Sequence, residues 1–453
     1  MRREYRGKNV VVTGAGRTGL ALCAYFCHRG AAVTLSDSRS AGQIDGLETL
    51  TGMGVAFDLG GHSEELFSAA DLVALSPGVP LTVPAVAAAL RAGVPVLGEI
   101  EIAFDEFGAP LVAITGTNGK STTTTVMGNI FQAWGKQTFV GGNLGTPLIE
   151  AVDGRRWDWG VAELSSFQLE AIAAFHPRYA LLLNLTEDHL DRYPDMASYV
   201  AAKMRMFENM AADDIAVLNA EDALVMQATA AIRPRRVFFS SARVADQGMG
   251  CDGSDIVWRW QGIERRFPVR ELRLKGLHNI ENVMAAMIPP LLEGCPAEIV
   301  WQTACAFAGL PHRMVEVRVL DGVPWYNDSK GTNVGSVLKS LAGLAAPVTL
   351  IAGGKDKGGD YAPLATLVQE KVAHLVLIGQ AAGRIAEVLG DLTHTVRAGS
   401  LDEAVLLARK LTPAGGSVLF SPGCSSFDMF KNYEERGDLF ARAVLELSDR
   451  ETV

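Results

Sequence analysis

The segment from Leu111 to Thr122 holds the residues whose types and spacing are best suited to chemistry. An apolar run, Leu111–Ile114, is followed after Thr115 by the loop Gly116-Thr117-Asn118-Gly119-Lys120-Ser121-Thr122 and then by a helix-compatible stretch. Glycines let backbone N–H groups turn towards phosphate oxygens, a lysine adds positive charge, and a serine hydroxyl can bind magnesium. The standard loop has four residues between its glycines, whereas this one has only Thr117 and Asn118, and Ile114 replaces the first glycine. The segment still predicts binding of a nucleoside triphosphate, with ATP as the expected nucleotide.

Polar side chains follow two later predicted strands of the same region. Glu163 comes directly after Gly160–Ala162 and offers the hard oxygen that a magnesium ion on phosphates requires. The alternative is a surface glutamate that caps the next helix. Asp188, His189 and Asp191 follow another strand, at the edge where parallel sheets bind ligands. A lone histidine is more often structural, but its place in this cluster favours a functional role.

A second glycine-rich turn lies near the N-terminus. Gly14, Gly16 and Gly19 form a GxGxxG pattern after the strand Val10–Thr13, and Asp37 follows eighteen residues beyond Gly19. This is the pattern of dinucleotide-binding folds, in which the acid binds a ribose. The same turn can hold any diphosphate against a helix N-terminus, so the pattern alone does not identify a cofactor.

The last third of the chain has four loops rich in small and polar residues, each at a strand-to-loop junction. One such loop would mean little, but four of them suggest a binding face. Upstream, Asn279 and Asn282 stand one turn apart at the start of a predicted helix, where they could cap it or face a purine. The four loops are Pro311–Arg313, Asn327–Asn333, Gly353–Gly359 and Ser421–Asp428.

Apolar runs that alternate with helical patterns predict three α/β domains: a Rossmann-like domain at 1–98, a P-loop ATPase domain with a small β insertion at 99–309, and a second Rossmann-like domain at 310–453. The insertion is expected as antiparallel strands within Val237–Val269. The other strands that we predict are Val10–Thr13, Ala32–Leu35, Leu72–Leu75, Pro95–Leu97, Gly160–Ala162, Ala180–Leu185, Ile215–Leu218, Val348–Ala352, His374–Ile378 and Ser417–Phe420.

The composition of the chain limits the classes of binding partner that we expect. The 453 residues include 41 basic and 51 acidic ones, which leaves a formal charge of −10 and argues against nucleic acid or an acidic membrane surface as the main partner. No apolar run approaches the length of a membrane span, and the N-terminus has no signal core, so we expect a cytoplasmic protein. The six cysteines lack zinc-type spacing and are expected as free thiols. No interface signal stands out, and we expect a monomer.

Taken together, the motifs resemble those of the Mur ligases. The resemblance rests on five segments in the family's order, Thr115–Ser121, Asn184–His189, Leu277–Asn279, Leu310–Arg313 and Asn327–Asn333, and it covers nearly the whole chain. It is nearest to the members that add D-glutamate to UDP-N-acetylmuramoyl-L-alanine, because of Asn327–Asn333 and the segment Ser421–Tyr433. The family also has the shortened phosphate loop, which it shares with folylpolyglutamate synthases. The Asp-Asn-Pro-Arg motif of diaminopimelate-adding relatives is not found.

The resemblance implies a role for each matching residue. Residues 1–98 would bind the UDP-sugar, 99–309 the ATP and 310–453 the amino acid. Lys120, His189 and Lys203 would be catalytic, with Lys203 carbamylated as in relatives. Magnesium would be held by Ser121, Glu163, His189 and Lys203. ATP would be bound by Gly116, Thr117, Asn118, Gly119, Lys120, Ser121, Thr122, Asn279, Asn282, Arg313 and Asp328. The UDP-sugar would contact Thr18, Asp37, Arg39, Ser76, Pro77, Gly78 and Asn143, and D-glutamate would contact Thr332, Lys357, Ser426, Phe427 and Tyr433.

The implied reaction is ATP-dependent amide-bond formation through an acyl phosphate, a step in the synthesis of peptidoglycan precursors. Closure of the third domain would shield the acyl phosphate from water. Three rival interpretations stay open at this point. One is a nicotinamide oxidoreductase, which would bind NAD(P) rather than UDP. Another is a ligase with a different amino-acid acceptor, either a sister Mur enzyme or a folylpolyglutamate synthase. The third is a nucleotide-binding regulator without catalysis, which is disfavoured because Lys120, Glu163, His189 and Lys203 are all present.

Overall fold

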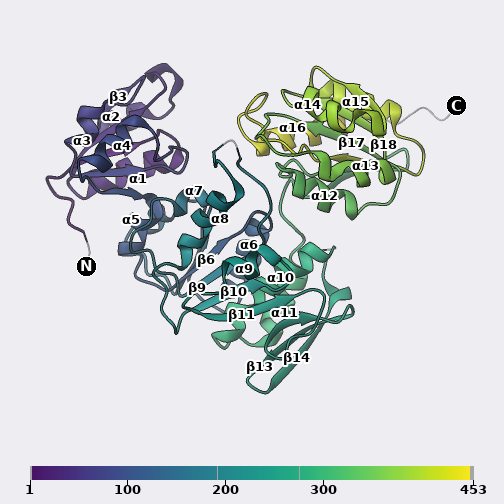
Figure 1. Ribbon diagram of the computed structural model, residues 1–453, viewed down its shortest axis with the longest axis horizontal. Helices are drawn as coiled ribbons and strands as arrows, with labels where there is room; N and C mark the ends of the chain where they lie inside the picture. The colour runs from purple at the N-terminus through teal and green to yellow at the C-terminus, as the bar shows by residue number, and fades with distance from the viewer. Residues whose placement is uncertain (1–2, 191, 275, 449–453) are drawn as a thin grey trace. The chain divides into compact units, whose positions relative to one another are not determined.

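The computed structural model describes residues 3–190, 192–274 and 276–448 (Figure 1). The chain divides into two compact units. The first unit comprises Met1–Leu185 and Ala197–Phe307, and the second comprises Thr186–Met196 and Ala308–Val453. The short segment Thr186–Met196 therefore belongs with the second unit, although elements of the first unit flank it in the sequence.

The first sheet of the first unit is parallel and has the order β3-β2-β1-β4-β5. Its strands are β1 (Asn9–Thr13), β2 (Ala32–Asp37), β3 (Ala56–Leu59), β4 (Leu72–Leu75) and β5 (Val96–Gly98), and its helices are α1 (Arg17–His28), α2 (Leu47–Gly52), α3 (Glu64–Ser68) and α4 (Pro84–Arg91). The strand order reverses between β1 and β4. Parallel sheets bind ligands at such a switch point, and the loops after β1 and β4 meet there.

The second sheet of the first unit has the order β14-β13-β12-β11-β10-β9-β6-β8-β7. Its strands are β6 (Leu111–Thr115), β7 (Thr138–Gly142), β8 (Trp159–Glu163), β9 (Tyr179–Leu182), β10 (Ile215–Asn219), β11 (Arg235–Ser240), β12 (Gly248–Cys251), β13 (Asp255–Trp260) and β14 (Ile263–Pro268). The helices of this part are α5 (Glu99–Phe107), α6 (Lys120–Ala133), α7 (Ser166–Leu169), α8 (Met196–Met204), α9 (Ala223–Ala228), α10 (Leu277–Leu292) and α11 (Ala297–Ala306). Figure 1 labels helices α6, α10 and α11 in this part of the chain, and their buried side chains form one apolar cluster with the sheet.

The predicted β insertion is confirmed in part. Strands β12, β13 and β14 pair in antiparallel fashion, and they extend the nine-stranded sheet rather than form a separate one. The prediction was wrong for β11, which pairs in parallel with β10 and with β12. An apolar run carries no information about strand direction. The direction of β11 is set by the α9 crossover, which returns the chain to the same end of the sheet.

The sheet of the second unit has the order β15-β16-β20-β17-β18-β19. Its strands are β15 (Val315–Leu320), β16 (Val323–Asn327), β17 (Val348–Gly353), β18 (Val372–Ile378), β19 (His394–Arg397) and β20 (Ser417–Phe420), with helices α12 (Val334–Ala342), α13 (Ala365–Lys371), α14 (Ala382–Leu389), α15 (Leu401–Leu411) and α16 (Tyr433–Glu446). The predicted parallel sheet is confirmed except at one edge, where β15 and β16 form an antiparallel hairpin. Strands β16, β20 and β17 are neighbours, so three of the four predicted polar loops leave the same edge of the sheet.

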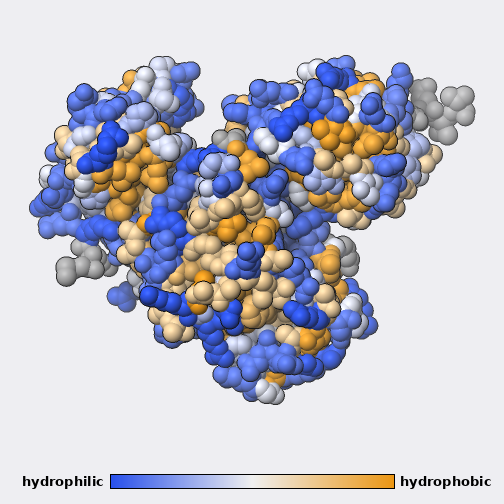
Figure 2. Space-filling model, viewed as in Figure 1, coloured by the Kyte–Doolittle hydropathy of each residue, from blue (hydrophilic) through white to orange (hydrophobic). Residues whose placement is uncertain are grey.

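Figure 2 shows hydrophilic and apolar residues mixed over this face of the molecule. Among the described residues, no helix is both long enough and apolar enough to span a membrane. The six cysteines are free thiols, as predicted, and four of them are buried.

Candidate active site

The loop after β6 has the backbone conformation that a phosphate-binding loop requires. Gly116 and Gly119 have φ angles of 145° and 88°, in the region that favours glycine, and a side chain at 119 would collide with the amide oxygen of Asn282. The main-chain N–H of Thr117 donates to the Asn184 carbonyl at 3.0 Å, and that of Asn118 donates to Asn184 Oδ1 at 2.8 Å. Because α6 begins at Lys120, its N-terminal N–H groups adjoin this loop, as in an anion site.

Two lysines bind the same turn of the loop. Lys120 Nζ donates to the carbonyl oxygens of Gly116 at 2.9 Å and Thr117 at 2.7 Å. Lys203 Nζ donates to the same Gly116 carbonyl at 3.0 Å and lies 4.6 Å from the centre of the Tyr199 ring. Lys203 is only 2% exposed. The fold therefore brings together two of the three residues predicted to be catalytic, 83 positions apart in the chain.

Glu163 fits a magnesium ion at this loop. The strand register pairs Glu163 with Ile114 of β6, directly before the loop begins. Its Oε1 accepts a hydrogen bond from Asn143 Nδ2 at 2.7 Å, whereas Oε2 is buried and has no hydrogen-bond partner among the described residues. A buried carboxylate oxygen without a partner is costly, and a hard cation would satisfy it.

Ser121 is buried in the first turn of α6 and would supply a second oxygen. Among the described residues, no group of three or more His, Cys, Asp and Glu side chains could hold a metal by itself. Mg²⁺ usually binds one or two protein oxygens, and substrate phosphates and water complete its coordination.

The two asparagines at the start of α10 lie at different depths. Asn282 is buried, and its amide faces Gly119 of the phosphate loop. Asn279 is half-buried one turn earlier. The predicted nucleotide contacts of the first unit thus gather around one loop, whereas Arg313 and Asp328 lie in the second unit.

In the N-terminal sheet, the carboxylate of Asp37 binds groups of the protein itself, whereas its motif predicts that it binds a ribose. Its carboxylate accepts hydrogen bonds from the Ala15 N–H at 2.7 Å and from Arg39 Nε and Nη2 at 2.9 Å each. The hydrogen bonds from Arg39, which have the largest effect, and from Ala15 lower the pKa of Asp37. Burial acts in the opposite direction but does not outweigh them. Asp37 thereby anchors the glycine-rich turn and orients Arg39, whose side chain is 45% exposed and accessible to an anionic ligand.

The segment Ser76-Pro77-Gly78 lies against the same turn. The Ser76 hydroxyl donates to the carbonyl of Gly14 at 3.2 Å, and Gly14 has a φ of 90°. Thr18 lies half-buried in the first turn of α1. The predicted UDP-binding residues of the loops after β1, β2 and β4 are therefore brought to one edge of the sheet.

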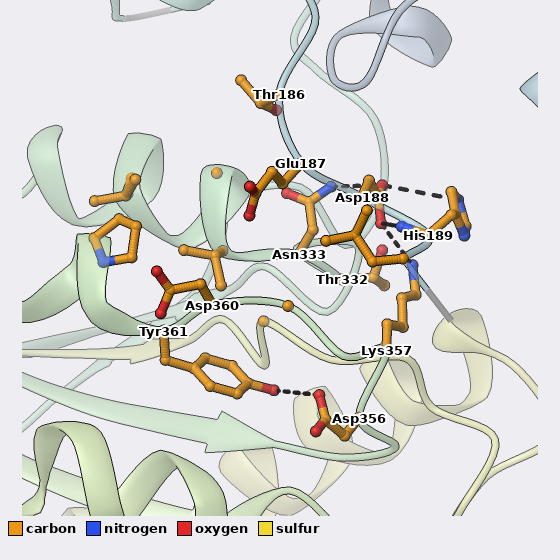
Figure 3. Close-up of a pocket in the computed structure, with 17 residues that line it drawn as sticks. Thr186, Glu187, Asp188, His189, Thr332, Asn333, Asp356, Lys357, Asp360 and Tyr361 are labelled. Carbon is orange, nitrogen blue, oxygen red and sulfur yellow. Dashed lines mark hydrogen bonds and ion pairs between the residues drawn. The ribbon is translucent and has the colours of Figure 1, made fainter. Parts of the chain in front are cut away.

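The second unit contains a cavity of about 250 Å³ (Figure 3). It is lined by Thr186–Leu190, the start of α12, the loop after β17 and Gly423. Asp188 accepts a hydrogen bond from Asn333 Nδ2 at 3.0 Å and forms an ion pair with Lys357 Nζ at 3.3 Å. His189 lies beside it, with Nε2 at 3.8 Å from the carboxylate of Asp188. Asp191, the third member of the predicted cluster, is outside the described residues.

The remaining predicted residues of the second unit lie on the loops around this sheet edge. Asp328 is buried, and its carboxylate accepts hydrogen bonds from the Ser340 and Ser421 hydroxyls at 2.7 Å each. Burial raises its pKa. Asp328 therefore joins the loops after β16 and β20. Arg313 is half-buried, and within the described part of the chain its Nε has no hydrogen-bond partner.

The loop after β20 carries Ser426, which is buried, and Phe427, which is 67% exposed. Tyr433 begins α16, and its ring centre lies 3.7 Å from the Lys330 ammonium. Thr332 lines the cavity together with Lys357. Of the five residues predicted to surround D-glutamate, these two are the ones that the cavity brings together.

The sequence analysis missed the contacts that two residues make. Asn184 holds the phosphate loop with its carbonyl and its side chain, and Asp188 pairs with Lys357. Both belong to a motif that we had recognised, but their partners lie 66 and 169 positions away. The adjacency of β9 and β6 would have revealed the first contact, and no local pattern reveals the second.

The strand, the glycine-rich loop and the helix that begins with Lys120 and Ser121, on a mainly parallel sheet, define a P-loop nucleotide-binding protein. Comparison with known proteins specifies this class further. Residues 114–289 match the Mur ligase middle domain, and residues 8–98 match the N-terminal domain described as Mur ligase MurD-like. The chain belongs to the Mur ligase family.

Full-length relatives support this assignment. The chain is 65% identical to UDP-N-acetylmuramoylalanine--D-glutamate ligase of Syntrophotalea carbinolica over 441 residues, which cover 97% of this chain and 98% of the relative. It is 51% identical to the ligase of the same name from Geotalea uraniireducens, over 98% of this chain and 99% of the relative. Among solved structures, the MurF ligase of Thermotoga maritima in complex with ADP matches with a TM-score of 0.60 at 15% identity, over 98% of this chain and 96% of that one. The last likeness concerns the fold alone.

Proposed function

We propose that this protein is an ATP-dependent ligase that joins D-glutamate to UDP-N-acetylmuramoyl-L-alanine and releases ADP and phosphate. The reaction would belong to the synthesis of peptidoglycan precursors. The observation that carries the proposal is the phosphate loop with Lys120, Lys203 and the partnerless oxygen of Glu163 around it, in a chain 65% identical to a ligase with this name. The nicotinamide interpretation loses support, since such an enzyme has no use for these groups, and the relatives named as D-glutamate ligases disfavour the other two.

The chemistry follows from charge. The substrate carboxylate must attack the γ-phosphate of ATP, which brings two anions together. Lys120 would move from the loop carbonyls to the phosphates and reduce that repulsion, and the N–H groups at the start of α6 would hold the phosphate oxygens. When bound at Ser121 and Glu163, Mg²⁺ would neutralise further phosphate charge. The acyl phosphate that results is attacked by the D-glutamate nitrogen, with loss of phosphate.

Lys203 and His189 would complete the catalytic set. A carbamate on Lys203 would turn a buried cation into an oxygen ligand of the kind that Mg²⁺ prefers, and Lys203 and His189 would serve a second Mg²⁺. The burial of Lys203 at the Gly116 carbonyl supports this role, because an ordinary surface lysine would have no reason to lie there.

The other predicted residues take roles in the three ligand sites. The ATP site would use Gly116–Thr122, Asn279, Asn282, Arg313 and Asp328. The UDP-sugar site would use Thr18, Asp37, Arg39, Ser76–Gly78 and Asn143. The D-glutamate site would use Thr332, Lys357, Ser426, Phe427 and Tyr433. We assign the binding of ATP, the UDP-sugar and D-glutamate mainly to domains at 99–309, 1–98 and 310–453, respectively, in a cytoplasmic monomer.

The proposal is tested by phosphate release from ATP and Mg²⁺ in the presence of UDP-N-acetylmuramoyl-L-alanine. D-Glutamate, L-glutamate, L-alanine, L-lysine and diaminopimelate are supplied in parallel. Turnover with D-glutamate alone is the expected result. Turnover with another amino acid would keep the mechanism and reassign the acceptor. Protein that binds ATP but stays inactive with all five would contradict the proposed substrates.

A Lys203→Ala variant tests the carbamate. Its activity should fall to background, and bicarbonate should not restore it. The wild-type enzyme stripped of CO₂ should regain activity when bicarbonate is added. Full activity of Lys203→Ala at low bicarbonate would contradict the assignment.

A further inference from the structure

The loop after β17 is tied to its surroundings on both sides of Lys357. On the N-terminal side, the backbone of Lys355 forms a two-bond bridge with Ser425, with N···O distances of 2.9 and 3.1 Å. On the C-terminal side, Gly358 has a φ of 76° and donates its N–H to Asp356 Oδ1 at 3.0 Å. Lys357 is therefore the central residue of a tight turn that the Asp356 carboxylate closes.

Asp356 is itself fixed by two further side chains. Its Oδ1 also accepts a hydrogen bond from the Tyr361 hydroxyl at 3.1 Å, and its Oδ2 accepts one from Arg384 Nη1 at 2.6 Å. The Tyr361 hydroxyl also lies 3.1 Å from the buried Cys424 Sγ. The carboxylate thus connects the turn to α14 and to the loop after β20.

Asp356 and Lys357 point in opposite directions (Figure 3). The carboxylate of Asp356 lies at the Tyr361 hydroxyl, whereas the ammonium of Lys357 extends to Asp188 at the other side of the cavity. Arg384 pairs with Asp356. This pairing balances a negative charge that would otherwise compete with a ligand for the neighbouring ammonium.

We propose that Asp356 is a positioning residue for the amino-acid substrate: it closes the turn that aims Lys357 at an acidic substrate's carboxylate, while Arg384 keeps its charge from competing. The substrate carboxylate would replace Asp188 as the partner of Lys357. The inference rests on the proposed function, because it takes Lys357 as part of the D-glutamate site.

The test uses the full-length enzyme with the variants Asp356→Ala, Asp356→Asn and Arg384→Met. For Asp356→Ala, the KM for D-glutamate should rise about tenfold, kcat should change by less than about threefold, and the KM values for ATP and the UDP-sugar should stay within about twofold. Asp356→Asn keeps an acceptor for Gly358 and Tyr361, so its KM should rise by only about threefold. Arg384→Met should also raise the KM for D-glutamate.

Asp391→Ala is the matched control, because it removes an exposed carboxylate from the same unit and should leave all constants unchanged. The rate at which acetic anhydride modifies Lys357, followed by mass spectrometry without substrates, is a second readout that needs no turnover. This rate should rise in Asp356→Ala.

An unchanged KM for D-glutamate in folded Asp356→Ala and Asp356→Asn would overturn the inference. Equal changes in all three KM values would also overturn it, since they would indicate a general structural role. If the wild-type enzyme does not use D-glutamate, the proposed function fails instead. The modification rate then decides: a faster rate in Asp356→Ala supports positioning of Lys357, and an unchanged rate overturns it.

Discussion

Among the predicted site residues, Lys120 is the one whose loss we expect to lower the catalytic rate most. In the structure its ammonium is held by two loop carbonyls, so it is already beside the place where phosphates would bind. Lys120→Met should lower kcat at least about 100-fold, because one preorganised charge is lost from the transition state. Phosphate release measures the effect. Lys136→Met, which removes a lysine stacked on Trp134 beyond the end of the same helix, should keep wild-type activity.

Glu163→Gln separates charge from shape at the predicted magnesium site. Glutamine keeps an oxygen acceptor for Asn143 but supplies a neutral ligand, so the Mg²⁺ concentration for half-maximal phosphate release should rise about tenfold. Glu298→Gln, at an exposed position of α11, should leave the Mg²⁺ dependence unchanged. An unaltered Mg²⁺ curve for Glu163→Gln would remove this residue from the site.

Single site residues could be predicted where one local sequence motif contains them. Gly116, Lys120 and Ser121 belong to one such motif. Asn184 and Asp356 could not be identified in that way. Asn184 acts on a loop 66 positions away, and Asp356 pairs with Arg384, 28 positions further along on a separate helix. Such contacts depend on which strands and helices are neighbours, and local spacing does not encode this.

At the scale of elements, a strand could be predicted from the local sequence only where its residues form a continuous apolar run. The predicted strands Leu72–Leu75 and Ser417–Phe420 coincide with β4 and β20. Both strands are wholly buried runs. By contrast, β3 was missed, and its burial explains why: none of its four residues is fully buried, so it has no continuous apolar signal.

Helix α5 provides an element-scale prediction about pH. Its first residue, Glu99, is buried and accepts a hydrogen bond from the Ile149 N–H at 2.7 Å. Burial raises the pKa of Glu99 from 4.5 to about 7, against the effect of its hydrogen bonds. Between these values the folded chain binds more protons than the unfolded chain, so stability should fall as pH rises through this range and level off above about 7.

The size of the effect follows from the gap between 4.5 and 7, which corresponds to about 3 kcal/mol. Glu99→Gln carries no titrating group, so its free energy of unfolding should lack this decline and should exceed that of the wild type most at pH 8. Urea titrations between pH 4.5 and pH 8 measure the difference. Glu48→Gln, at an exposed position of α2, is the control and should keep the wild-type slope.

At the scale of the whole molecule, the division into two units predicts how the chain unfolds. The apolar clusters around Val112 and Val73 draw only on the first unit, and those around Leu350 and Phe420 draw only on the second. Cores that share no side chains can melt independently, so calorimetry should resolve at least two transitions.

Ligand binding should then show which unit each transition belongs to. Mg²⁺ and ADP at a concentration 100 times the Kd should stabilise the first unit by about 2.7 kcal/mol, and its transition should move up by roughly 4 °C because only the folded unit binds nucleotide. The second unit's transition should move less. Lys120→Met should show a smaller shift at the same ADP concentration, which ties the effect to the phosphate loop. One cooperative transition that ADP moves as a whole would show instead that the two units unfold together.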